Sequence, residues 1–121
     1  MGLVTYDNCE FINLTSRAIH IYCENGNIIT VEPSGKIATM VDFELFKVQT
    51  VNGIGLYHQS YGEPNNLPLE DMENNRYGEK FIYIVSDEVR LAVLWRRDVA
   101  SPCSSFTNGE RVMYMGLVRN K

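Results

Sequence analysis

The sequence is poor in the residues that build metal sites, disulfide frameworks and membrane spans. Its three cysteines, Cys9, Cys23 and Cys103, form no Cys-x-x-Cys pair and have no histidine array beside them. This spacing argues against a zinc site, and an odd number of thiols cannot all pair in disulfides. No stretch approaches the ~20 apolar residues of a membrane helix, and the N-terminus lacks the basic start and apolar run of a signal peptide. We therefore expect a cytoplasmic protein with reduced thiols and no membrane partner.

Positive charge is also scarce, since 11 Lys and Arg face 15 Asp and Glu, for a net charge of -4. Such a chain lacks the basic surface of a protein that binds duplex nucleic acid through its phosphates. The basic residues gather at one end: residues 1–88 carry 5 basic and 13 acidic side chains, whereas residues 89–121 carry 6 and 2. A local anion site in the C-terminal third is compatible with this distribution.

Catalytic motifs are missing as well. The sequence has no Gly-x-Ser-x-Gly elbow, no phosphate-binding loop with Gly-Lys, and no Gly-x-Gly-x-x-Gly. Of the two histidines, only His58, in His58-Gln59-Ser60, fits half of a two-histidine phosphoesterase motif, and His20 is expected to face solvent. A cysteine-histidine dyad stays open, although Cys9 and Cys23 lie in apolar patterns typical of buried thiols. We expect no catalytic residues, no metal and no cofactor.

What the sequence does have is the composition of one folded domain over residues 1–121, with 45% hydrophobic residues. The Asn25-Gly26 dipeptide between β-branched flanks predicts a hairpin of about 18–23 with 28–32. After a turn at Pro33-Ser34-Gly35, alternation over 36–51 predicts one or two strands with a bend near Asp42. The chain turns again at Asn52-Gly53 before residues 56–61.

The second half predicts a buried strand, a helix and a final hairpin. Residues 62–78 form a long surface loop, and the apolar run 81–85 predicts a central strand buried on both faces. Ser86 is a helix N-cap residue followed by two acids, so a helix is expected near 87–97, covered by the sheet and, as one alternative, also by a partner chain. Asn108-Gly109 predicts a turn before a last strand at 111–118. The predicted fold class is α+β: a single domain with a mainly antiparallel sheet, one main helix near 87–97 and a C-terminal hairpin.

Arginine and aromatic side chains in this half can bind a nucleotide. Planar guanidinium groups suit phosphate oxygens, and aromatic rings stack on bases. In the alternative interpretation, Arg97 pairs with Asp98 at the helix end and the aromatics belong to the core. The candidates are Arg96, Arg97 and Arg111 for phosphate, Tyr61, Tyr83 and Phe106 for stacking, and Asn13, Arg17 and Asn108 as further polar contacts.

Several short motifs occur in order along most of the chain, and together they resemble a family of small proteins encoded by phages, prophages and bacterial genomes. They are Asn13-Leu14-Thr15, Glu32-Pro33-Ser34-Gly35, Tyr61-Gly62-Glu63, Leu67-Pro68, Tyr83-Ile84-Val85-Ser86, Arg97-Asp98 and Gly116. The chain departs from the family pattern at Ser16-Arg17, where the family has Pro-His. Any role of that histidine is therefore not carried over to Arg17.

The same pattern resembles the anti-Thoeris phage proteins that act as molecular sponges. The resemblance implies a non-enzymatic protein, in the cytoplasm of an infected bacterial host, that binds a cyclic ADP-ribose isomer without cleaving it. It further implies a homodimer or higher homo-oligomer with ligand sites where chains meet. Burial of the ligand between protomers would give the slow release that sequestration requires.

Two other interpretations stay open. The first is a phage accessory protein that works by protein-protein contact, whose signature is an exposed apolar patch. The second is an inhibitor that mimics nucleic acid, against which the small net charge and the basic C-terminal third both argue.

Overall fold

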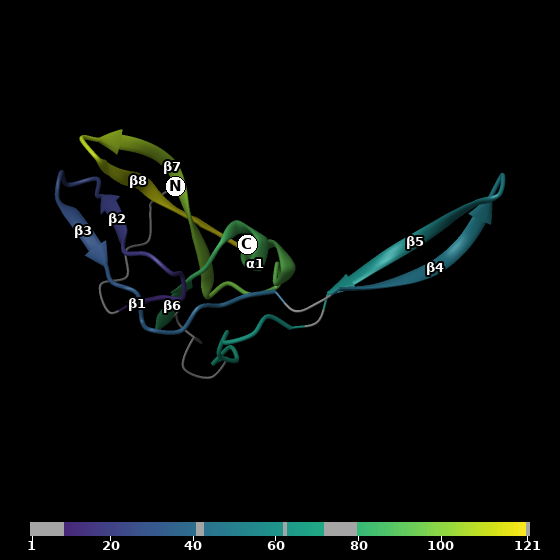
Figure 1. Cartoon of the computed structure of the whole chain (residues 1–121). Coiled ribbons are helices and arrows are strands. Elements are labelled where there is room, and N and C mark those ends of the chain that lie inside the picture. Colours follow the sequence, from purple (N-terminus) through teal and green to yellow (C-terminus); the bar gives the residue numbers. More distant parts are fainter. Residues whose placement is uncertain (1–8, 41–42, 62, 72–79, 121) are drawn as a thin grey trace, which may run out of the picture.

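In the computed structural model the chain forms a six-stranded sheet, a separate two-stranded hairpin and one short helix (Figure 1). The structure describes residues 9–40, 43–61, 63–71 and 80–120. The elements are β1 Glu10–Asn13, β2 Ile19–Tyr22, β3 Ile28–Val31, β4 Phe43–Val51, β5 Ile54–Tyr61, β6 Phe81–Ile84, α1 Asp87–Ala92, β7 Val99–Asn108 and β8 Arg111–Arg119.

The large sheet is mixed, which corrects the prediction of a mainly antiparallel sheet. Its strand order is β1-β6-β7-β8-β2-β3, and the pairs β1-β6, β6-β7 and β2-β8 are parallel. Strands β6 and β7 are parallel because α1 carries the chain back between them, as a crossover connection does. A bridge from Asn13 to Pro33, just beyond β3, brings the two edges together, so the sheet nearly closes into a barrel.

The predicted hairpins are confirmed. Strand β2 pairs antiparallel with β3, and Gly26 in the connecting loop has a φ of 87°, a conformation that glycine adopts without steric cost. The C-terminal hairpin β7-β8 turns at Gly109, whose φ is 67°. Pro102 is tolerated within β7 because β6 pairs only with Val99 and Ala100. Beyond residue 100, the edge of β7 that faces β6 therefore has no backbone hydrogen bonds to this strand that a proline would break.

The helix is shorter than the predicted 87–97. Ser86 is the N-cap as expected, and its hydroxyl accepts a hydrogen bond from the Val89 amide at 3.3 Å. The helix ends at Ala92, because the Asn120 side chain donates to the Arg90 and Val93 carbonyls and so satisfies the helix C-terminus. Leu94 and Trp95, expected to be covered on the longer helix, lie in the following turn and are exposed.

One face of the sheet holds the main core. Leu14, Ala38, Tyr83, Val85, Val89, Val93 and Val99 form its buried cluster. Ile84 alternates with Tyr83 and Val85 and so faces the other side, where it is fully buried. The strand predicted at 81–85 is confirmed as an interior strand, since β6 lies between β1 and β7, but it ends at Ile84, and Phe81 and Ile82 are only half-buried.

The second unit, formed by β4 and β5, is a hairpin that projects away from the sheet (Figure 1); we call it the arm. Its tip is the predicted turn: Asn52 and Gly53 both have positive φ, 52° and 80°, as a two-residue type I′ turn requires. A register shift between Lys47 and Gln49 marks a bulge in β4.

The bend predicted near Asp42 lies outside the described residues. Of the loop predicted at 62–78, only 63–71 are described, and they form no helix or strand.

Candidate functional site

The segment after β1 is held in place by the side chain of Asn13, which is almost completely buried. Its amide nitrogen donates to the Arg17 carbonyl at 2.7 Å and to the Val31 carbonyl at 2.9 Å. Its oxygen accepts from the Thr15 backbone amide at 2.9 Å and lies 2.6 Å from the Thr15 hydroxyl. The Asn-Leu-Thr motif therefore fixes the loop that carries Arg17.

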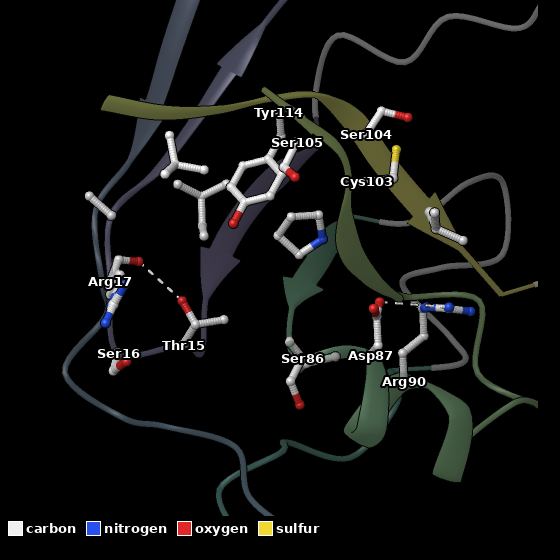
Figure 2. Close-up of a pocket in the computed structure, with 16 residues that line it drawn as sticks. Thr15, Ser16, Arg17, Ser86, Asp87, Arg90, Cys103, Ser104, Ser105 and Tyr114 are labelled. Carbon is white, nitrogen blue, oxygen red and sulfur yellow. Dashed lines mark hydrogen bonds and ion pairs between the residues drawn. The ribbon is translucent and has the colours of Figure 1, made fainter. Parts of the chain in front are cut away.

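A cavity of about 730 Å³ opens beside this loop. Figure 2 shows Thr15, Ser16 and Arg17 on one side of it, and Ser86, Asp87 and Arg90 at the start of α1 on the other. Strands β7 and β8 close it with Cys103, Ser104, Ser105 and Tyr114, among other residues. Its volume falls within the range of small-molecule sites.

A polar network holds Arg90 on its side of the cavity. Its Nε donates to the Ser101 hydroxyl at 2.8 Å, and Nη1 donates to the Asn120 side-chain oxygen at 3.3 Å. Asp87 accepts a hydrogen bond from Ser101, and its Oδ1 lies 3.8 Å from Nη2 of Arg90. Arg90 is therefore a lining residue of the cavity whose guanidinium is fixed by Ser101, Asn120 and Asp87.

Arg17 has no such network. It is exposed, and among the described residues no hydrogen bond or ion pair engages its guanidinium group, while its backbone carbonyl is held by Asn13. Tyr114 is half-buried, and its ring projects from β8 into the space between Arg17 and Arg90 (Figure 2). The cavity thus offers a fixed arginine, an unengaged arginine and an aromatic ring.

Ser104, also on the cavity wall, has a φ of 54° within β7. A left-handed conformation at a non-glycine residue is strained, and such strain often gathers at binding sites.

Of the predicted phosphate ligands, Arg96 is buried and paired. Its Nε and Nη2 bind the two carboxylate oxygens of Asp98 at 2.9 and 2.7 Å. The alternative interpretation gave Asp98 to the neighbouring Arg97, but the bidentate partner of Asp98 is Arg96. Phosphate binding by Arg96 stays a prediction. In this structure its guanidinium group pairs with Asp98.

The other predicted arginines are far apart. Arg97 is exposed just before β7, and its carbonyl accepts a hydrogen bond from Arg119 at 2.8 Å. Arg111 pairs with Asn108 at the opposite end of the β7-β8 hairpin, where both residues line a shallow cavity. Since β7 has 10 residues, about 30 Å separates its two ends. Within one chain, the structure does not bring the predicted arginine cluster together.

The predicted aromatic residues are also dispersed. Tyr83 belongs to the core, and Phe106 packs edge-on against Tyr22 with ring centroids 6.5 Å apart. Tyr61 ends β5, and its side chain lies outside the described part of the chain. Of the eight predicted site residues whose side chains the structure describes, only Arg17 lines the large cavity. Arg90 and Tyr114, which line the cavity, were not among the residues selected from the sequence.

Burial raises the pKa of Tyr83 above its usual value of 10.0, and the nearby negative charge of Asp98 raises it further. Since the unfolded state then loses this proton at lower pH than the folded state does, stability should fall as pH rises above 10. We expect Tyr83→Phe to weaken this alkaline loss, measured by urea unfolding at pH 8 and above pH 10. Tyr57→Phe, at an exposed position of the arm, is the matched control, and equal alkaline losses in both variants would contradict the assignment.

The histidines lie outside the cavity. His20 is half-buried rather than solvent-facing, with its Nδ1 2.8 Å from the Thr30 hydroxyl, and His58 is exposed on the arm. No group of three or more His, Cys, Asp or Glu side chains that could hold a metal ion occurs among the described residues. In the same residues, no helix has the length and apolar character to cross a membrane.

Searches of protein-family models, curated proteins and solved structures found no match to this chain.

Proposed function

We propose that this protein binds a small nucleotide of the cyclic ADP-ribose class in the cavity between the Asn13–Arg17 loop and the start of α1, and holds it without cleaving it. The observation that carries the proposal is the position of Arg17 and Arg90 on opposite sides of a cavity of about 730 Å³, with Tyr114 between them. It would act as a sponge in the infected bacterial cell, like the anti-Thoeris proteins that its sequence resembles.

Each part of such a ligand has a matching group in the cavity. A diphosphate suits two arginines, because guanidinium groups pair with phosphate oxygens in planar geometry. An adenine can stack on the Tyr114 ring. Thr15, Ser86 and Ser105 supply hydroxyl groups for ribose oxygens. Arg90 is fixed in advance, so little ordering cost falls on its side of the site.

The lining favours binding without bond cleavage. Asp87 is the single carboxylate among the described residues that line the cavity, and its Oδ1 is engaged by Ser101 and Arg90. General base catalysis needs a group within hydrogen-bond reach of the proton that it removes.

The test is calorimetric titration and thermal shift with cyclic ADP-ribose isomers, NAD and ADP-ribose, followed by mass analysis of the recovered ligand. We expect one of the cyclic isomers to bind and to return intact. Arg17→Ala should weaken binding by about 10- to 100-fold, the loss of one charge-assisted contact. Circular dichroism should stay unchanged, because the Arg17 side chain is exposed.

Arg97→Ala and Arg111→Ala are the matched controls, since each removes an exposed arginine outside this cavity. Both should bind as the wild type does. If these variants lose binding and Arg17→Ala does not, the ligand occupies another site. If the ligand is recovered cleaved, the sponge proposal is wrong.

A specific observation also favours the second candidate function, a non-enzymatic role through protein-protein contact. The arm exposes a row of large apolar side chains, which is the signature expected of an interaction protein. Absence of binding to every nucleotide in the screen would favour this function.

A further inference from the structure

The arm is apolar on both faces, and among the described residues no other helix or strand of its own chain packs against it. Seven of its large apolar side chains are 41–64% exposed. Phe46, Val51, Ile54 and Leu56 share one face by the strand register, while Leu45 and Tyr57 lie on the other. An isolated two-stranded hairpin is marginally stable in water, and one with two apolar faces needs a covering surface.

The exposed surface is large enough for a stable dimer. At about 150–200 Å² per large side chain, the exposed parts of Phe46, Val51, Ile54 and Leu56 on one face amount to roughly 350 Å². Two exchanged arms that each pack this face, with the equal area that they cover on their partners, would bury roughly 1,400 Å². Stable specific interfaces bury about 1,200–2,000 Å².

The body of the same chain carries a matching apolar cleft. A cavity of about 290 Å³ lies between residues 63–70 and the turn after α1, lined by Leu67, Leu69, Val93 and Trp95 among others. Trp95 is 66% exposed and Leu69 80% exposed. Tryptophan is among the residues that most often dominate binding energy at interfaces.

The position of the cleft indicates that its occupant is the arm of a second copy. The cleft begins at Glu63 and Pro64, close in sequence to the end of β5, so a two-fold axis near the base of the arm would place each arm against the other chain's cleft.

We infer that two copies of this chain dimerise by reciprocal arm exchange, in which the β4-β5 arm of each packs into the Leu69-Trp95 cleft of the other. This contact is separate from the proposed nucleotide cavity, and it stands whether or not that cavity binds a ligand.

The test is analytical ultracentrifugation of the full chain and of variants in the arm and the cleft. The wild type should be a dimer at about 10 µM. Ile54→Asp at the arm tip and Trp95→Asp in the cleft should each weaken association by about 100-fold or more, because each loss occurs twice in a symmetric dimer. Both residues are exposed in the single chain, so circular dichroism should remain that of the wild type. Ile29→Asp, at an isoleucine of similar exposure on β3, is the matched control and should remain dimeric.

Mixing the two monomeric variants tests the arm-to-cleft contact itself. The Trp95→Asp chain retains an intact arm and the Ile54→Asp chain an intact cleft, so the mixture should form a heterodimer at about 100 µM although neither variant does so alone. Failure of the mixture to associate would overturn the proposed arm-to-cleft contact, and a dimeric Trp95→Asp variant would mean that arms meet arms. A monomeric wild type would overturn the exchange and assign the arm to a different protein, and a dimeric Ile54→Asp variant would overturn any role of the arm.

Discussion

Replacing Asp98 by alanine is expected to lower the free energy of unfolding by about 3–5 kcal/mol, the usual cost of breaking a buried ion pair from one side. The carboxylate is 1% exposed, and it holds both Nε and Nη2 of Arg96. Without it, a buried guanidinium is left without its counter-charge. Urea unfolding followed by circular dichroism measures the loss, and a change below about 1 kcal/mol would contradict the structural role of this pair.

The double variant Arg96→Met with Asp98→Ala is the control for this result. It removes both charges, so most of the stability should return, because apolar replacement of a buried pair is often neutral. The same variant tests the sequence-based assignment of Arg96 to a phosphate. If it folds and binds nucleotide with wild-type affinity, Arg96 serves the fold rather than the ligand.

Replacing Asn13 by alanine is expected to cost about 3 kcal/mol of stability, since the loss removes three hydrogen bonds between a buried side chain and the backbone. The side chain joins the Arg17 carbonyl, the Val31 carbonyl and the Thr15 amide, and so ties the end of β1 to the end of β3. Thermal and urea unfolding measure the effect. Asn108→Ala, at an exposed asparagine in the C-terminal hairpin turn, should change stability by less than about 1 kcal/mol.

A second readout separates the two roles that Asn13 can have. If it positions the loop, Asn13→Ala should weaken nucleotide binding to the same degree as Arg17→Ala or less, and the affinity should be partly recovered at lower temperature, where the fold is retained. Stability equal to that of the wild type, with binding abolished, would instead make Asn13 a direct ligand contact.

Elements specified by neighbouring residues were predictable from the sequence. Asn25-Gly26, Asn52-Gly53 and Asn108-Gly109 each mark a turn in the structure, because a positive φ is a local requirement. The apolar run 81–85 likewise predicts its own burial. The pairing of β1 with β6 and of β2 with β8 was not predictable, because it joins segments far apart in the chain and leaves no periodicity that distinguishes parallel from antiparallel neighbours.

The candidate site was predicted only in part, for the same reason. Arg96 and Arg111 are close in sequence, yet one is buried beside Asp98 and the other lies at the tip of a long hairpin. Arg17 and Arg90 are far apart in sequence, and only the closure of the sheet brings them to one cavity. Sequence proximity is therefore a poor guide to a site whose walls come from opposite ends of the chain.

The strand order also sets the sequence of events in folding. The centre of the sheet, β6 to β8, comes from residues 81–119, whereas β1 joins one edge and the β2-β3 hairpin joins the other. During synthesis β2 and β3 can pair with each other as soon as they emerge, but β6, the partner of β1, and β8, the second partner of β2, do not yet exist. The N-terminal strands therefore cannot join the large sheet until the last third of the chain is made. Such long-range pairing slows folding, so this small protein should fold after synthesis, and slowly for its size.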